Sequence, residues 1–155
     1  MTLAALTLAA IMSLPVAAHI DAADAQRYAN DIALAAGDDV EVAMALVATA
    51  NAESDFDKRV ETCRRTGDNG AAVSQYQLHR NWWGGHSRAE LCGSNALATA
   101  LAGNALRTLR RMAGSWRAAF RRYVGCNTQS DPHLRKRAQT FERLMANAAV
   151  ALAKE

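Results

Sequence analysis

The sequence predicts a mainly helical domain with one insert, a small β-hairpin or an irregular segment, at about residues 57–93. Of the 155 residues 35 are alanine and only two are proline, which favours helix. Apolar residues recur at helical spacing on both sides of the insert. Five of the nine glycines fall between residues 67 and 93, where that spacing is lost. The length and the 50% hydrophobic content fit one domain.

The N-terminal segment allows two interpretations. Residues 2–18 form an uncharged apolar run that ends in Val16-Ala17-Ala18, a sequence that a signal peptidase could cut. No lysine or arginine precedes the run, as one would in a typical secretory signal. Residues 1–18 are therefore predicted to be either a signal peptide or a packed first helix, and residues 19–155 the domain. A run of 17 residues with Pro15 near its end is marginal for crossing a membrane, so no stable membrane span is expected.

Two helices are predicted next. Asp21 can cap the first, which ends at Gly37, and its predicted apolar face is Ala25, Tyr28, Ala29, Ile32 and Ala36. Asp38 or Asp39 can cap the second, from Val40 to about Glu53. The second helix is apolar nearly all round, which is typical of a helix surrounded by other helices. We therefore expect it to be central.

Three further helices follow the insert. The first opens at Asn95, the second ends at Gly125 and the third begins at Asp131-Pro132. Their predicted buried residues are, in that order, Leu97, Leu101, Ala105, Leu109 and Met112; Trp116, Phe120 and Tyr123; and Phe141, Leu144, Met145, Ala148 and Leu152.

Charge is distributed unevenly, although the net charge is only +3. Residues 1–62 hold three bases and ten acids, whereas residues 104–155 hold eleven bases and three acids. Such a basic half could attract a polyanion. No nucleic-acid-binding motif accompanies it, so a solvated basic helix face is expected and no specific nucleic-acid partner.

Glu53 is the first candidate for chemistry. It stands where the apolar second helix ends, and we expect it at the border between the core and a cleft. Burial and the negative end of the helix dipole both disfavour its charged form, which suits a general acid.

Several short motifs together resemble the lysozyme-like lytic transglycosylase domain. They are Glu53-Ser54-x-Phe56, the stretch Gly70-Ala71-Ala72-Val73-Ser74-Gln75-Tyr76-Gln77-Leu78, Asn104-Ala105-Leu106, Tyr123-Val124-Gly125, and Phe141 with Leu144. They occur in the family's order and cover about residues 40–146. Ser74 and Gln75 depart from the family, which usually has glycine and leucine there.

The resemblance implies a lysozyme-like fold and cleavage of the β-1,4 bond between N-acetylmuramic acid and N-acetylglucosamine in peptidoglycan. Glu53 carries over as the acid, and then as the base that helps the muramyl 6-hydroxyl to form a 1,6-anhydro product. Substrate contacts are expected from Ser54, Tyr76, Gln77 and Tyr123. For Tyr76, core packing is an equal alternative.

Asp68 decides between this reaction and hydrolysis. A lysozyme uses a second carboxylate beside the acid, and Asp68 is the best-placed candidate. Gly67-Asp68-Asn69-Gly70 is also a sequence that a tight turn requires without any chemistry, and we favour that interpretation. A hydrolytic lysozyme and a non-catalytic wall-binding or virion structural domain therefore remain alternatives.

Three cysteines leave at least one unpaired within a monomer. Cys63 and Cys92 bracket the insert and could form a disulfide in an oxidising compartment, although Cys126 could replace either partner. No closely spaced metal-ligand motif is present, so neither a metal nor a cofactor is expected. We expect a monomer that acts on peptidoglycan glycan strands outside the cytoplasm, in the periplasm or secreted, or in a virion.

Overall fold

The computed structural model describes residues 1–125 and 131–154, apart from the side chain of Asp68. It is mainly helical with one small antiparallel sheet, as predicted. The α-helices are α1 (Leu3–Met12), α2 (Ala22–Ala36), α3 (Val40–Glu53), α4 (Lys58–Glu61), α5 (Arg88–Gly93), α6 (Asn95–Ala113), α7 (Trp116–Val124) and α8 (Pro132–Leu152). Short 3-10 turns are η1 (Pro15–His19), η2 (Asp68–Gly70) and η3 (Arg80–Trp82), and the strands are β1 (Ala72–Val73) and β2 (Leu78–His79).

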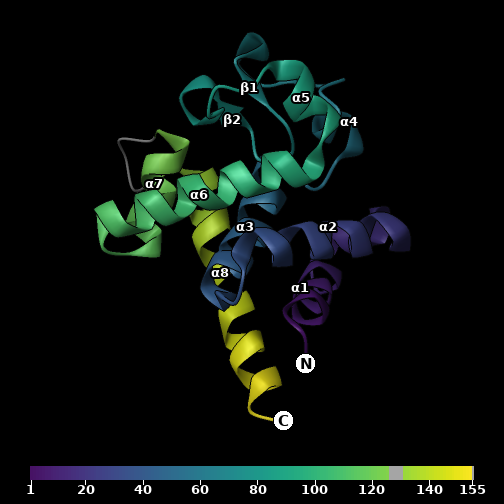
Figure 1. Ribbon diagram of the computed structural model, residues 1–155. Coiled ribbons are helices and arrows are strands. Elements are labelled where there is room, and N and C mark those ends of the chain that lie inside the picture. Colours follow the sequence, from purple (N-terminus) through teal and green to yellow (C-terminus); the bar gives the residue numbers. More distant parts are fainter. Residues whose placement is uncertain (126–130, 155) are drawn as a thin grey trace.

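Helix α3 lies at the centre of the molecule, as its apolar sequence predicts. All residues from Val42 to Ala50 are buried, and α1, α2, α6 and α8 pack around the helix (Figure 1). The side chain of Asp39 caps its start by accepting a hydrogen bond from the Val42 amide at 3.0 Å. Helix α3 therefore runs through the core, and its last residue, Glu53, lies at the edge of the core opposite to Asp39.

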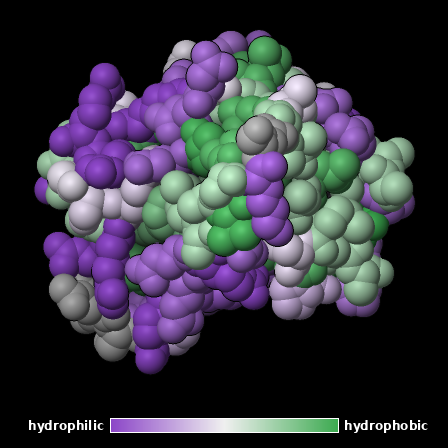
Figure 2. Space-filling view, turned by 90° about the horizontal axis from the view of Figure 1, so that it is seen from below, coloured by the Kyte–Doolittle hydropathy of each residue, from purple (hydrophilic) through white to green (hydrophobic). Residues whose placement is uncertain are grey.

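Residues 3–12 form helix α1, which packs mainly on α2 and α3. Leu6, Ile11 and the following Leu14 are buried in the core. The outer side remains open, since Met12 is 50% exposed. Seen from below, apolar residues gather over one half of the molecule and hydrophilic residues over the other (Figure 2). In the described part of the chain, no helix has both the length and the apolar character that a membrane crossing requires.

Two of the predicted helix faces are wrong in detail. Met112 of α6 is 63% exposed, because the buried face of α6 is formed mostly by the small residues Ala98, Ala102, Gly103 and Ala105 with Leu106 and Leu109. Small side chains let α6 pack closely against its neighbours, and a Cβ on Gly103 would contact Ala35 and Leu46. Leu152 is 44% exposed because α8 extends beyond the other helices at its C-terminal end (Figure 1).

The insert at about residues 57–93 combines the predicted hairpin with the short helices α4 and α5, which were not predicted. Ala72 pairs with His79 and Val73 with Leu78. An ionic cluster joins α4 to α2: Glu61 accepts hydrogen bonds from Arg27 at 2.8 Å and from the Tyr28 hydroxyl at 2.6 Å. The insert is thereby fixed to the helical body.

Candidate active site

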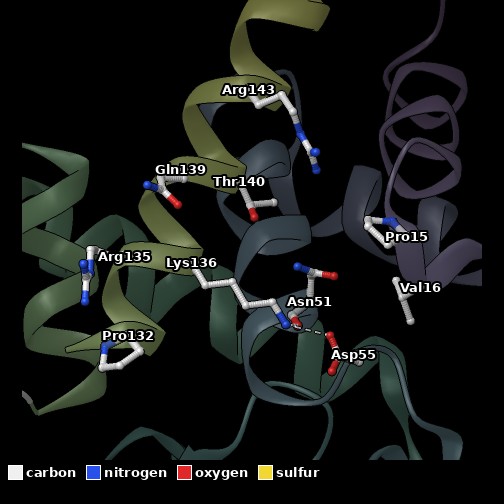
Figure 3. A pocket seen from close by; sticks show the side chains of 10 residues that line it. All are labelled: Pro15, Val16, Asn51, Asp55, Pro132, Arg135, Lys136, Gln139, Thr140 and Arg143. Atoms are coloured by element: carbon white, nitrogen blue, oxygen red, sulfur yellow. Dashed lines mark hydrogen bonds and ion pairs between the residues drawn. The ribbon is translucent and has the colours of Figure 1, made fainter.

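A cleft opens around Glu53 where α3 ends. Two cavities of about 320 and 240 Å3 share Glu53, Gly67, Gln77 and His133, so they form one cleft, called here the Glu53 cleft. Gly67 and Gln77 belong to the insert wall, while His133 and Tyr123 belong to the wall formed by α8 and α7. A larger groove of about 650 Å3 adjoins this cleft on the other side of Asp55 (Figure 3).

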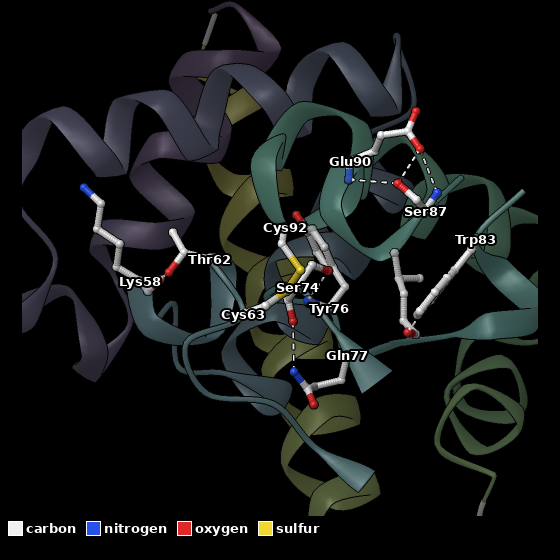
Figure 4. The surroundings of a disulfide bond; sticks show 11 residues. Lys58, Thr62, Cys63, Ser74, Tyr76, Gln77, Trp83, Ser87, Glu90 and Cys92 are labelled. Atoms are coloured by element: carbon white, nitrogen blue, oxygen red, sulfur yellow. Dashed lines mark hydrogen bonds between the residues drawn. A yellow bond between two sulfur atoms is a disulfide. The ribbon is translucent and has the colours of Figure 1, made fainter. Parts of the chain in front are cut away.

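A disulfide holds the insert wall together. Cys63 and Cys92 are bonded, with their Cα atoms 5.4 Å apart, which confirms the pairing that their positions suggested (Figure 4). Cys126, the other partner considered, lies outside the described residues. Because the bond closes the segment that contains β1 and β2, it restricts the movement of that wall of the cleft.

Glu53 is at the border between core and cleft, as expected, and its side chain is 22% exposed. Its carboxylate is not in a purely apolar setting, because Nη2 of Arg137 donates a hydrogen bond to its Oε1. Among the described residues no other group bonds to this carboxylate. Arg137 therefore holds the carboxylate of Glu53 in place from the α8 side of the cleft.

Arg137 is itself completely buried, on the face of α8 that packs against α3 and α7. Its guanidinium carbon lies 5.3 Å from the ring centre of Tyr123 and 5.9 Å from that of Phe120. Its Nε and Nη1 atoms have no hydrogen-bond partner among the described residues. Glu53 is therefore the carboxylate that compensates this buried charge.

Strained backbone surrounds the cleft. Directly after Glu53 and Ser54, Asp55 and Phe56 have φ values of 50° and 56°, in the left-handed region that non-glycine residues rarely adopt. Ser74 and Gln77, at the hairpin on the insert wall, have φ values of 66° and 48°. Such residues persist only where surrounding packing imposes them, and they concentrate at functional sites.

Ser54 and Gln77 reach the cleft as predicted, and both also make local hydrogen bonds. The Ser54 hydroxyl donates to the Ala50 carbonyl at 2.9 Å and accepts from the Phe56 amide, so it caps α3. The Gln77 amide donates to the Ser74 carbonyl at 2.9 Å (Figure 4). The Gln77 side chain can lie against Gly67 because a Cβ at residue 67 would collide with the Gln77 Oε1. Gln77 is thus held in a fixed position on the cleft wall.

Tyr76 packs in the core, which is the alternative that the sequence left open for it, and the expected substrate contact is wrong. Its side chain is fully buried, because the hairpin turn directs it into the core. Tyr123 does line the cleft, but its hydroxyl donates to the Tyr76 carbonyl at 2.8 Å and does not orient Glu53. Burial, and then the charge of Glu53, raise the pKa of Tyr123, so the phenol keeps its proton.

The segment that contains Asp68 forms a tight turn. The Gly70 amide donates to the Gly67 carbonyl at 2.9 Å, and Gly67 forms a β-bridge with Ala72. The backbone of Asp68 belongs to η2, but its side chain lies outside the described part of the chain. The role of Asp68 as a second carboxylate therefore stays a prediction.

Two residues of the site, Arg137 and His133, were missed in the sequence. His133 lines both parts of the Glu53 cleft, and Arg137 follows one turn later on α8. Arg137 does carry a signal, since it falls at helical spacing between the apolar residues Leu134 and Phe141. No pattern marks His133.

Metal binding has no support in the described side chains, among which no group of three or more His, Cys, Asp or Glu is arranged to hold an ion. Comparisons of the whole chain with protein-family models, curated proteins and solved structures find no match.

Proposed function

We propose that the protein cleaves the β-1,4 glycosidic bond between N-acetylmuramic acid and N-acetylglucosamine in peptidoglycan, with Glu53 as general acid and base. The observation that carries the proposal is the position of Glu53: it ends the most buried helix and opens into a cleft between the insert and α8. The order of the short motifs supports the same reaction.

In the proposed reaction, the Glu53 carboxyl first donates its proton to the leaving glycosidic oxygen. The resulting carboxylate then accepts the proton of the muramyl 6-hydroxyl as that oxygen attacks C1 of the same sugar, which gives a 1,6-anhydro end. Arg137 donates a hydrogen bond to the same carboxylate and so fixes its position in the cleft.

Gln77 and Tyr123 shape the substrate site in this proposal. The amide of Gln77, held at the cleft wall, can hydrogen-bond a hydroxyl or acetamido group without competing for the proton of Glu53. Tyr123 lines the other wall, and its hydroxyl is already bonded to the backbone carbonyl of Tyr76.

The choice between transglycosylation and hydrolysis depends on the carboxylates at the cleft. Among the described side chains that line it, Glu53 is joined only by Asp55, which is 61% exposed and paired with Lys136 at 2.9 Å. A lysozyme mechanism needs a second carboxylate across the scissile bond. Asp68 would have to supply it.

Mass spectrometry of fragments released from purified sacculi tests the proposal. We expect soluble muropeptides with 1,6-anhydromuramyl ends. Reducing ends would instead assign a hydrolytic lysozyme, and Asp68→Asn should then reduce the rate without unfolding the protein. No release of soluble muropeptides would contradict cleavage and favour a non-catalytic wall-binding or virion domain. The disulfide agrees with an extracytoplasmic or virion location for this activity.

A further inference from the structure

A basic groove continues from the Glu53 cleft along helix α8. This groove, called here the α8 groove, has a volume of about 650 Å3, larger than either part of the Glu53 cleft. Lys136, Thr140 and Arg143 line it from α8, Asn51 from α3, Asp55 from the segment just after α3, and Val16 from η1 (Figure 3).

The groove and the cleft are continuous through two links. Asp55 lines both, two residues after Glu53. Along α8, His133 lines the cleft and Lys136, almost one turn later, lines the groove. A glycan bound at Glu53 would therefore have the α8 groove beside it, within reach of a substituent on the sugar.

Positive charge exceeds negative charge in the groove. Arg135, Lys136 and Arg143 contribute cations, whereas Asp55 is the one acidic residue among its lining residues. Lys136 is engaged, since its Nζ lies 2.9 Å from Asp55 Oδ1 and 3.3 Å from the Asn51 carbonyl. Arg143 is exposed, points from α8 toward Pro15, and has no hydrogen-bond or ion-pair partner among the described residues (Figure 3).

Arginine at such a place selects for carboxylate or phosphate, because its planar donors match two oxygens at once. The hydroxyl and acetamido groups of a glycan are neutral and do not require this charge. Muramic acid, however, carries a peptide stem, and peptide stems contain free carboxylates. The groove thus has the charge that a stem would need when its sugar occupies the cleft.

We propose that the α8 groove binds the carboxylates of the peptide stem, with Arg143 as the principal contact. This inference rests on the proposed peptidoglycan cleavage and adds a substrate preference to it: strands that carry stems are cleaved better than bare glycan. Lys136 and Thr140 line the same side of the groove and supply further donors to the stem.

Two substrates and two variants test the preference. The substrates are glycan strands with their stems and the same strands after an amidase has removed the stems. We expect wild type to cleave the stem-bearing strands with a kcat/KM on the order of tenfold higher, the scale of one charge-assisted hydrogen bond. Arg143→Glu should abolish that preference while leaving cleavage of bare strands unchanged. Arg111→Gln, at an exposed arginine on α6 outside the groove, should retain it.

Binding measured by calorimetry separates this inference from the proposed function. The probe is a disaccharide that carries its stem, compared with the same disaccharide without it. We expect wild type to bind the stem-bearing form more tightly than the bare form, and its affinity for the stem-bearing form to fall as the salt concentration rises. Arg143→Glu should bind both forms equally. Equal binding by wild type, or equal kcat/KM for both strands, would overturn the inference and leave glycan cleavage intact. Stem-dependent binding without any cleavage would retain the groove and remove the proposed activity.

Discussion

At the residue scale, Glu53 and Arg137 depend on each other. Arg137 is completely buried, and Glu53 supplies the opposite charge from the border of the cleft. Removing one partner of a buried ion pair leaves an uncompensated charge, which is costlier than removing both. Glu53, the residue proposed to carry the chemistry, therefore also stabilises the core through Arg137.

Stability measurements on variants test this dependence. Glu53→Ala should lower the free energy of unfolding by about 3–5 kcal/mol, because the guanidinium of Arg137 loses its carboxylate. The double variant Glu53→Ala with Arg137→Met should lose less than the sum of the two single variants, with a coupling of about 1–3 kcal/mol. Urea unfolding of all four proteins gives the cycle. Strictly additive losses would show that the pair does not contribute as a unit.

The position of Glu53 at the end of a buried helix and beside a cleft is predictable from the sequence, whereas the burial of Arg137 is not. Glu53 was found because it ends an unusually apolar helix, a local pattern. Arg137 was counted with the basic residues of the C-terminal half, although it falls on the apolar face of α8. For Tyr76 the motif predicts a substrate contact and its aromatic character predicts core packing equally well, and the turn between β1 and β2 decides for the core.

At the element scale, the insert depends on two attachments more than on its strands. The sheet has only two residues in each strand, which is too little for independent stability. The disulfide closes the segment, and Glu61 of α4 bonds to Arg27 and Tyr28 of α2. The ends of the long helices are predictable from capping residues and glycines. Helices α4 and α5 are too short to show a helical period in the sequence.

Loss of the disulfide should therefore weaken the protein measurably. The bonded cysteines are 29 residues apart, and a loop of that length corresponds to about 3.6 kcal/mol of stabilisation. Cys63→Ala with Cys92→Ala should lower the free energy of unfolding in urea by about that amount. A reductant should destabilise wild type similarly and leave the double variant unchanged. An unaltered unfolding midpoint in the double variant would refute a stabilising role for the bond.

At the scale of the whole molecule, ion pairs within the acidic N-terminal half connect α2 to the insert. Asp24 of α2 lies 2.8 Å from Arg27 and 2.9 Å from Lys58 of α4. These hydrogen bonds, that of Arg27 first, hold the pKa of Asp24 below its usual value of 3.8. In the basic C-terminal half, Arg135, Lys136 and Arg143 line the α8 groove. Arg137 is instead buried beside Glu53, and Arg107 donates to the carbonyls of Ala35 and Ala36 on α2.

Acid should weaken the attachment of the insert. A carboxyl whose pKa is lowered by folding stabilises the folded state above its usual pKa, and this contribution is lost as the pH falls through the lower folded value. Between about pH 5 and pH 2, wild type should therefore lose more stability than Asp24→Asn, which lacks the titrating group. Thermal unfolding at several pH values measures the difference. Parallel pH profiles would contradict it.

The proposed chemistry is tested by the rate at which Glu53→Gln releases soluble muropeptides from sacculi. Glutamine keeps the oxygen that Arg137 binds but has no proton to transfer. We predict a folded variant, by circular dichroism and urea unfolding, whose rate falls on the order of a thousandfold. Glu142→Gln, the same change at an exposed glutamate on α8, should retain the wild-type rate. A folded Glu53→Gln protein that cleaves sacculi as fast as wild type would contradict the role of Glu53.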